Sequence, residues 1–496
     1  MVYVKILAMN IIDFSENKFL IVGGAGVTGS SIINYLRYKA VSDNRIVVLH
    51  SHQDLELHHI QSADVIVLSP GVFVNLPNLE YARELGKLVL GDIELFAREV
   101  KLWQEHHGTK IIGITGSNGK TTCATFTAYL ASGIGYHTEL AGNIGIPVLD
   151  VFLKYKKLND SGILPSVPQI IVLELSSYQL ESTYNLYLDS ATVLNISEDH
   201  LDHGKDDVGY GYSMLEYTFA KSRIFKHAHT CVLNADDVRV CDMYKNGMKT
   251  VWFGSDKVLS EYCPKLYNTV FDQNKIRLQG QHNIINVLAG IALLESALNQ
   301  RIGLEVLAKL VQEFAPLPHR INIYKSTSGN LKHTVFFVDD SKATNIDATR
   351  VALDTCRDLF GTNKPSHACH LILGGDSKGQ NLSDLANLCH LHLPMIASIR
   401  VIGKDRKSIV ESLLADPNIV QHQDIGSVCV FEHEKLSQAI IAITQQIEKE
   451  QESDTLNFSI LLAPACSSLD QYKSYAERGN DFVSILKQYY LIERWK

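Results

Sequence analysis

The chain has 496 residues, of which 46% are hydrophobic and 20% are charged, and its formal net charge is −8. This length predicts two to four domains, and the composition is ordinary for a globular protein. The negative charge does not support a surface for nucleic acid or anionic membranes, and no apolar run is long enough to span a bilayer.

Nine cysteines lie between Cys123 and Cys466, and none forms a C-x-x-C pair. An odd count without a framework indicates free thiols in a reducing cytosol. The N-terminal stretch MVYVKILAMNIIDFSENK is partly apolar but has no small-residue cleavage site. We therefore expect a cytoplasmic protein, acting as a monomer, with no nucleic-acid partner and no membrane insertion.

The first block, residues 1–98, predicts a parallel sheet with helices on its faces. Short apolar runs bounded by turn residues are typical of buried parallel strands. Such runs occur at 19–22, 46–49, 65–68 and 88–90. Segments that can be helical separate several of them, which gives the β-α-β alternation of an α/β domain.

The second block, residues 99–316, also alternates. We expect strands at 111–114, 170–173 and 192–194, and a helix at 282–298. The stretch KKLNDSGILPSVPQ, residues 156–169, is polar and contains two prolines, so it is expected to be a surface loop.

The third block, residues 317–496, follows the proline-rich stretch APLPHR at 315–320, which predicts a linker and a hinge. Its expected strands are 335–338, 371–373, 399–402, 428–430 and 459–462. The chain is therefore expected to have an α/β fold of three domains, with a P-loop-type central domain between two Rossmann-like domains.

The first glycine-rich loop, Gly24–Gly29, has the spacing G-x-G-x-x-G between a strand and a stretch that can be helical. A helix N-terminus there would offer free N–H groups to a diphosphate. A dinucleotide site also needs an acid at the end of the second strand, and Asp54 comes late. Two alternatives remain: a tight turn without a ligand, and a site for a nucleotide diphosphate other than NAD.

The second glycine-rich loop, TGSNGKTT at 115–122, is a variant P-loop with Ile114 where the strict pattern has glycine. Gly116 and Gly119 leave room for N–H groups to face phosphate, and Lys120 adds a positive charge. Thr121 offers a hydroxyl to Mg²⁺. A chance glycine-rich turn is disfavoured because Gly-Lys-Thr-Thr at a strand-to-helix junction is specific.

Two further residues are expected at the same sheet edge, since ligands collect at the C-terminal ends of parallel strands. Glu174 ends an apolar strand, where a carboxylate is costly unless it binds something. His200 follows the strand that ends near residue 194. A lone histidine is more often structural, but the position of His200 at this sheet edge favours a role as a ligand.

Six segments of the chain resemble the Mur ligase family, the ATP-dependent amide-forming ligases of peptidoglycan precursor synthesis. The segments are TGSNGKTT (115–122), GNIG (142–145), ELSSYQLE (174–181), NISEDHLDH (195–203), HNIIN (282–286) and LPHR (317–320). Folylpolyglutamate synthetase shares parts of this core, so these segments do not identify the substrate.

The third block narrows the resemblance within the family. DDSKATN (339–345) and LLAPACSSLDQYKSYAERGNDF (461–482) are similar to the members that add D-glutamate to UDP-N-acetylmuramoyl-L-alanine. The Asp-Asn-Pro-Arg signature of members that add a diamino acid does not occur. Ala463 and Tyr475 depart from the family pattern, in which Ser and Phe are common.

The resemblance implies ATP, two Mg²⁺ ions, D-glutamate and the UDP-linked acceptor as ligands, with an acyl-phosphate intermediate. The implied ATP residues are Gly116, Ser117, Asn118, Gly119, Lys120, Thr121, Thr122, Asn283, Asn286, Arg320 and Asp340. The implied metal ligands are Thr121, Glu174, His200 and a carbamylated Lys221. The implied residues for the UDP-linked acceptor are Val27, Thr28, Ser69, Pro70, Gly71, Asn143 and His200.

The implied D-glutamate residues are Lys342, Thr344, Lys378, Ser468, Leu469 and Tyr475. Simpler interpretations remain for two lysines and one serine: Lys342 as a solvated loop lysine, Lys221 as a solvated helix lysine, and Ser468 as a helix N-cap. Rival functions are a ligase of the same fold with another substrate, an NAD-binding protein, and a scaffold without ligase activity.

Overall fold

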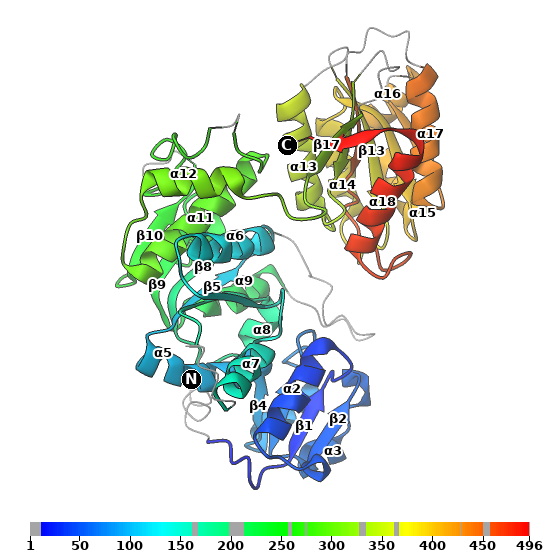
Figure 1. Cartoon of the computed structure of the whole chain (residues 1–496). Helices are drawn as coiled ribbons and strands as arrows, with labels where there is room; N and C mark the ends of the chain where they lie inside the picture. The colour runs from blue at the N-terminus through cyan, green and yellow to red at the C-terminus, as the bar shows by residue number, and fades with distance from the viewer. Residues whose placement is uncertain are drawn as a thin grey trace. The chain divides into compact units, whose positions relative to one another are not determined.

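The computed structural model describes residues 11–160, 167–197, 213–255, 260–272, 275–326, 334–361, 367–426, 428–449 and 457–495. Within these residues the strands form three sheets with helices between them (Figure 1). The α/β fold is confirmed. The chain divides into two compact units, Met1–Asp272 with Ile284–Gln312, and Gln273–Asn283 with Glu313–Lys496.

The first sheet has the strand order β2-β1-β3-β4 and is parallel throughout. Its strands are β1 (Phe19–Val22), β2 (Ile46–Leu49), β3 (Val65–Leu68) and β4 (Leu88–Gly91). The helices around it are α2 (Val27–Tyr38), η1 (Asp43–Arg45), η2 (His52–Asp54), α3 (Leu57–Ser62), α4 (Pro77–Glu84) and α5 (Asp92–His107). All four expected strands are confirmed.

Helices cover both faces of this sheet at its central strands, β1 and β3, which are apolar and buried at every position. In β1, Phe19 and Ile21 pack with residues of α2 and α5, whereas Leu20 and Val22 pack with residues of α3 and α4. This arrangement is typical of parallel strands that are buried on both sides.

The second sheet has the order β10-β9-β8-β5-β7-β6 and is also parallel. Its strands are β5 (Lys110–Thr115), β6 (Thr138–Gly142), β7 (Ile170–Glu174), β8 (Leu188–Val193), β9 (Ala228–Asn234) and β10 (Thr250–Phe253). Its helices are α6 (Lys120–Gly133), α7 (Val148–Asp160), α8 (Ser177–Glu181), α9 (Met214–Ser222), η3 (Arg223–Phe225), α10 (Val238–Cys241), α11 (Gln281–Leu298) and α12 (Leu304–Glu313).

Two expectations for the second block need correction. The stretch predicted as a loop from residue 156 continues α7 as far as Asp160, because Phe152 and Tyr155 hold this helix against the core; residues 161–166 lie outside the described part of the chain. The strand expected at 192–194 begins earlier, at Leu188. Its first half was not predicted, because the polar residues Asp189 and Ser190 interrupt the apolar run.

The first two sheets are joined within one compact unit. Ser31 of α2 donates to Asp150 of α7 at 2.8 Å. The fully buried carboxylate of Glu94 in α5 accepts the backbone N–H groups of Tyr184 and Asn185 at 2.8 and 2.9 Å. Because a buried carboxylate needs such donors, these contacts fix α5 against the loop after α8.

The third sheet has the order β15-β14-β13-β16-β12-β11-β17. Its strands are β11 (Asn322–Ser326), β12 (Thr334–Asp339), β13 (Ala368–Gly374), β14 (Ile396–Ile402), β15 (Cys429–Glu432), β16 (Asn457–Leu462) and β17 (Ile492–Arg494). The two strands β11 and β17 are antiparallel additions that the apolar pattern did not predict, and the other five are parallel.

Helices cover both faces of the third sheet. They are α13 (Ile346–Phe360), α14 (Leu382–Leu391), α15 (Arg406–Leu414), α16 (Pro417–Asp424), α17 (Leu436–Lys449) and α18 (Tyr475–Tyr489). Residues of α13 to α16 pack on one face and residues of α17 and α18 on the other. Among the helices that the structure describes, none is long and apolar enough to cross a membrane.

Candidate active site

The glycine-rich loop after β5 is fastened to the chain that leaves β8. Ser117 N donates to Asn195 O at 2.9 Å, and Asn118 N donates to the Asn195 side chain at 2.8 Å. Ser117 Oγ lies 2.9 Å from Ser197 N and 3.0 Å from Ser197 O. These bonds hold the loop at the C-terminal edge of the sheet, where parallel strands place ligands.

Gly119 is the N-cap of α6 and has a left-handed φ of +81°. A Cβ atom at this position would collide with the side chain of Asn286, which is buried in α11. Glycine therefore serves two purposes here, because it adopts this conformation without strain and lets Asn286 approach the loop.

Two lysines meet at this loop. Lys120 Nζ donates to the carbonyl oxygens of Gly116 and Ser117, both at 2.7 Å. Lys221, from α9, also donates to Gly116 O, at 2.9 Å, and its Nζ lies 4.5 Å from the centre of the Tyr217 ring. Lys221 is only 2% exposed, so the interpretation of Lys221 as a solvated helix lysine is wrong.

Glu174, the last residue of β7, pairs with Ile114 of β5, one residue before β5 ends and the glycine-rich loop begins. It is buried, and its Oε1 accepts Asn143 Nδ2 at 3.1 Å. Gly142 has φ +103°, and a Cβ there would collide with Glu174 O, so glycine permits the bond from Asn143 N to Glu174 O at 2.8 Å. Sequence reasoning did not pair Asn143 with Glu174.

The second carboxylate oxygen, Glu174 Oε2, is buried and has no hydrogen-bond partner among the described residues. An unpartnered carboxylate oxygen is unfavourable in the interior unless it binds a cation. Carboxylate and hydroxyl oxygens suit Mg²⁺, so Glu174 fits a metal ligand, with the half-buried Thr121 at the start of α6. His200, the other expected ligand, lies outside the described residues.

The first glycine-rich loop and the Ser69–Gly71 turn lie at one edge of the first sheet, because β1 and β3 are neighbours. Helix α2 begins at Val27, which is 73% exposed, and its N-cap is Gly26, which has no side chain to cover the helix N-terminus. Ser69 is buried, and its Oγ has no partner within the described ranges. Thr28 and Pro70 are partly exposed and Gly71 has φ +101°. Open helix N–H groups and a spare hydroxyl suit a diphosphate.

Asp54, the late acid of this block, has a structural role. Its carboxylate accepts Ser51 N at 3.2 Å in a capping box at η2.

Three residues expected near the nucleotide lie in the C-terminal unit. Asp340 follows β12, and burial raises its pKa to about 7, opposed by the positive charge of Arg320. Burial, aided by the same arginine, lowers the pKa of His282 to about 4. Asn283 is buried, and its Nδ2 donates to Gln279 O at 2.7 Å. The positive charge of Arg320 thus acts on both His282 and Asp340, and all three residues belong to the second compact unit.

Lys342 is half-buried, and its Nζ lies 4.1 Å from the centre of the Tyr475 ring. It is therefore not a freely solvated loop lysine, and a cation over a tyrosine face gains attraction. Ser468 is buried, and the N-cap of α18 is Ser474, so the helix-cap interpretation of Ser468 is wrong.

The remaining expected D-glutamate residues surround the same sheet edge. Lys378 is exposed, with φ +50°, and its N–H donates to Asp376 at 3.0 Å. Thr344 is partly exposed, and Leu469 is 68% exposed. The loops of Lys378 and Ser468 are connected, because Asp376 and Ser467 exchange backbone bonds at 2.8 and 3.0 Å.

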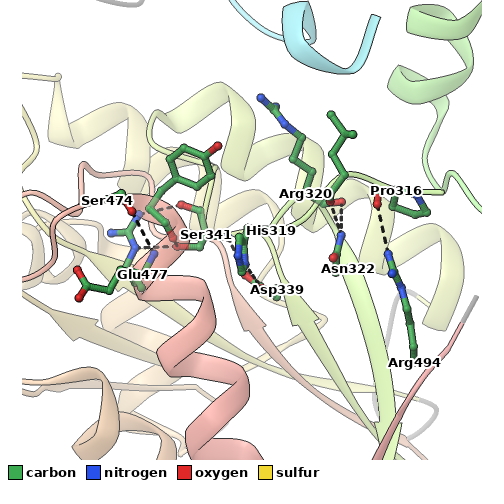
Figure 2. Close-up of polar contacts among 12 residues, drawn as sticks. Pro316, His319, Arg320, Asn322, Asp339, Ser341, Ser474, Glu477 and Arg494 are labelled. Carbon is green, nitrogen blue, oxygen red and sulfur yellow. Dashed lines mark hydrogen bonds and ion pairs between the residues drawn. The ribbon is translucent and has the colours of Figure 1, made fainter. Parts of the chain in front are cut away.

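The whole proline-rich linker at 315–320 belongs to the second compact unit, which includes Glu313–Lys496. Figure 2 shows Arg494 reaching Pro316 O at 3.3 Å and Asn322 Nδ2 donating to the linker backbone. It also shows His319 paired with Asp339, with 2.6 Å between Nδ1 and Oδ2. The hinge around Pro316 and Pro318 stays a prediction.

Two site residues were not predicted from the sequence. Tyr217 places its ring under Lys221 and its hydroxyl 3.2 Å from Ser117 Oγ; its spacing of four residues from Lys221 on α9 was a usable signal. Asn195 holds the loop through its side chain and carried no such signal, because its partner is 77 residues away.

Comparisons with known proteins agree with this geometry. Residues 114–294 match the Mur ligase middle domain. The chain is 34% identical to a UDP-N-acetylmuramoylalanine–D-glutamate ligase of Pasteurella multocida, over 95% of this chain and 98% of that relative. It is 35% identical to the ligase of the same name from Chromobacterium violaceum, over 85% and 83% of the two chains.

Solved structures show the same fold at low sequence identity. MurF from Acinetobacter baumannii aligns with a TM-score of 0.56 and 15% identity, over 87% of this chain and 92% of that one. Mycobacterium tuberculosis folylpolyglutamate synthase complexed with ADP aligns with a TM-score of 0.52 and 13% identity, over 80% and 95%.

Proposed function

Since the chain belongs to the UDP-N-acetylmuramoylalanine–D-glutamate ligases of the Mur ligase family, we propose that it joins D-glutamate to UDP-N-acetylmuramoyl-L-alanine in an ATP-dependent reaction. The observation that carries the chemistry is the register of Glu174 with Ile114, which puts a buried, incompletely bonded carboxylate beside the Lys120 loop. An acidic residue beside a phosphate-binding loop is the arrangement that phosphoryl transfer with Mg²⁺ requires.

In the first step, a carboxylate oxygen of the acceptor attacks the γ-phosphorus of ATP. A new O–P bond forms, the bond to the β,γ-bridging oxygen breaks, and ADP leaves an acyl phosphate behind. Lys120 holds the β- and γ-phosphates, and the N–H groups of Gly116 to Gly119 face the same charge. Asn143, bonded to Glu174, orients that carboxylate and lies near the acceptor.

In the second step, the amine of D-glutamate attacks the acyl carbon. The tetrahedral intermediate loses phosphate as its C–O bond breaks, and the nitrogen gives up a proton. Both steps gather negative charge, which lysine side chains stabilise in a site that excludes water. Mg²⁺ held by Thr121, Glu174, His200 and a carbamylated Lys221 would neutralise phosphate oxygens.

Each compact unit supplies part of the specificity. The first sheet binds the UDP end through Val27, Thr28 and the Ser69–Gly71 turn. Asn283, Arg320 and Asp340 contact adenosine, together with Asn286. The D-glutamate carboxylates meet Lys342, Thr344, Lys378, Ser468, Leu469 and Tyr475. We further infer two Mg²⁺ ions and a monomeric enzyme.

Phosphate release is the decisive assay. With ATP, Mg²⁺ and UDP-N-acetylmuramoyl-L-alanine, D-glutamate should release phosphate and L-glutamate should not. The same measurement with UDP-N-acetylmuramate and L-alanine, or with a folate acceptor and L-glutamate, tests the rival ligases of this fold. Phosphate release with one of those pairs and not with D-glutamate would replace the proposed substrate.

A further inference from the structure

Arg478, on the first turn of α18, is a buried cation whose hydrogen-bond acceptors are all neutral oxygens. It is 1% exposed. Its Nε donates to Ser341 Oγ at 3.0 Å, and Nη2 donates to Ser341 O and Cys466 O at 2.9 and 3.1 Å. Nη1 donates to Gly374 O at 3.4 Å. Among the described residues, no carboxylate forms an ion pair with it.

This arrangement is costly if stability is its only purpose. A buried cation loses its hydration, and carbonyl dipoles replace only part of it. Burial lowers the pKa of Arg478 to about 10, opposed by the charges of groups that include Asp470 and Asp339, so the guanidinium stays charged at neutral pH. An apolar side chain could fill the same volume without this cost, so the donors themselves need an explanation.

The three acceptor residues come from three neighbouring strands. β13, β16 and β12 are adjacent and parallel, so their C-terminal ends lie at one edge of the sheet. Gly374 ends β13, Ser341 follows β12, and Cys466 follows β16. The rigid fork of one guanidinium thus sets the spacing of three loops that are far apart in the sequence.

Each of these loops carries a residue proposed to bind D-glutamate. Lys342 directly follows Ser341, Ser468 comes two residues after Cys466, and Lys378 comes four residues after Gly374. We propose that Arg478 is the positioning residue of the D-glutamate site, holding these three side chains at the distances that the two carboxylates require. This inference rests on the proposed function, because it assigns the three loops to D-glutamate.

Helix α18 contributes to the same alignment through Tyr475. Ser341 Oγ donates to Tyr475 O at 2.8 Å, and the Tyr475 ring lies under Lys342. Asp340, proposed for the nucleotide, is held separately by a bond from its N–H to Leu462 O at 3.0 Å. Loss of the Arg478 guanidinium is therefore expected to weaken the binding of D-glutamate more than the binding of ATP.

Arg400 provides a matched control in the same unit. It is 5% exposed, and its donors also reach neutral oxygens, Ser398 Oγ at 3.3 Å and Gln446 Oε1 at 2.6 Å. It lies within β14, and neither partner belongs to a loop that carries a proposed substrate residue. Substituting it removes a comparable buried cation without touching the three loops.

The test compares Arg478→Lys and Arg478→Met with Arg400→Lys and Arg400→Met. We expect Arg478→Lys to raise KM for D-glutamate about tenfold and Arg478→Met to raise it further, since lysine keeps the charge but loses the fork. KM for ATP and for the UDP-linked acceptor should stay within about twofold. The Arg400 variants should lower Tm without changing KM for D-glutamate.

An unchanged KM for D-glutamate in Arg478→Lys, an equal rise for all three substrates, or an equal rise in Arg400→Lys would overturn the inference. If both Arg478 variants unfold below the assay temperature, Ser341→Ala replaces them. This substitution removes the hydroxyl that accepts from Arg478 Nε and should raise KM for D-glutamate about threefold. An unchanged KM for D-glutamate in Ser341→Ala would also overturn the inference. Turnover of D-glutamate by the unaltered protein reports separately on the proposed function.

Discussion

Lys120 and Lys221 donate to one and the same atom, the carbonyl oxygen of Gly116, at 2.7 and 2.9 Å. Two ammonium groups that share one carbonyl repel each other, and the repulsion is strong where water is scarce. An anion beside the loop, or conversion of one amine into an anion, would relieve it. We therefore expect Lys120 to meet an anion beside the loop and Lys221 to be converted into an anion, and each expectation has its own test.

Lys120→Ala is expected to lower kcat/KM on the order of 10²- to 10³-fold, as loss of one preorganised cation or donor does elsewhere. The fold should persist, because the bonds from Lys120 to the carbonyl oxygens of Gly116 and Ser117 stay within its own loop. Lys110→Ala is the control. Lys110 begins β5, the strand before the loop, and pairs with Asp189 at 2.9 Å, so its loss should leave turnover unchanged. Phosphate release measures the activity of both variants, and thermal unfolding measures their stability. Normal turnover in Lys120→Ala would rule out the assignment of this loop to ATP.

Glu174→Gln separates stability from activity. The amide retains an oxygen for Asn143 and removes a buried charge with an unpartnered oxygen. Without Mg²⁺ and ATP, the variant should therefore unfold at the same or a higher temperature than the unaltered protein. Its activity should fall about 100-fold or more, with partial recovery at high Mg²⁺. Full activity at ordinary Mg²⁺ would exclude Glu174 as a metal ligand.

Lys221 is predicted to be carbamylated in the active enzyme, which turns a buried cation into a carboxylate-like ligand for Mg²⁺. Lys221→Ala should lose most activity, and bicarbonate or short carboxylic acids should restore part of it. A carbamate carbon signal from ¹³C-bicarbonate should be present in the unaltered protein and absent from Lys221→Ala. Lys226→Ala, at an exposed lysine just after η3, should retain both the activity and the signal.

Lys342→Ala should raise KM for D-glutamate far more than KM for ATP, because it removes a cation facing one carboxylate. The Tyr475 ring restricts the position of this cation, since Lys342 Nζ lies 4.1 Å from the centre of the ring. Lys325→Ala, which breaks only a surface pair with Glu493, serves as the control. A rise in KM for ATP without a rise for D-glutamate would move Lys342 to the nucleotide site.

Asp92 makes stability depend on pH. Burial raises its pKa from 3.8 to about 7, although two backbone N–H groups oppose the shift. Between these values the folded protein binds a proton that the unfolded chain does not, so stability falls as pH rises towards 7. Asp92→Asn should therefore have a higher Tm than the unaltered protein at pH 8, and the difference should shrink near pH 5. An equal difference at both pH values would contradict the buried carboxylic acid.

The sequence by itself determined the strands whose two faces are both apolar. Phe19–Val22 and residues 335–338 lie in strands because nothing else buries four consecutive apolar residues between helices so well. It also determined the Gly116–Lys120 loop, since glycines and a lysine at a strand-to-helix junction have few other uses. Strands with polar positions, such as β11 and β17, could not be predicted, because their pairing with distant strands provides their stability.

Only the tertiary structure decided which polar side chains lost their water. Lys221, Ser468 and Arg478 each look like ordinary surface residues in the sequence, and each is buried. Their burial depends on partners far along the chain, such as Gly116 for Lys221 and Ser341 for Arg478. No local pattern encodes such pairs, because the desolvation of a side chain is a property of everything that packs around it.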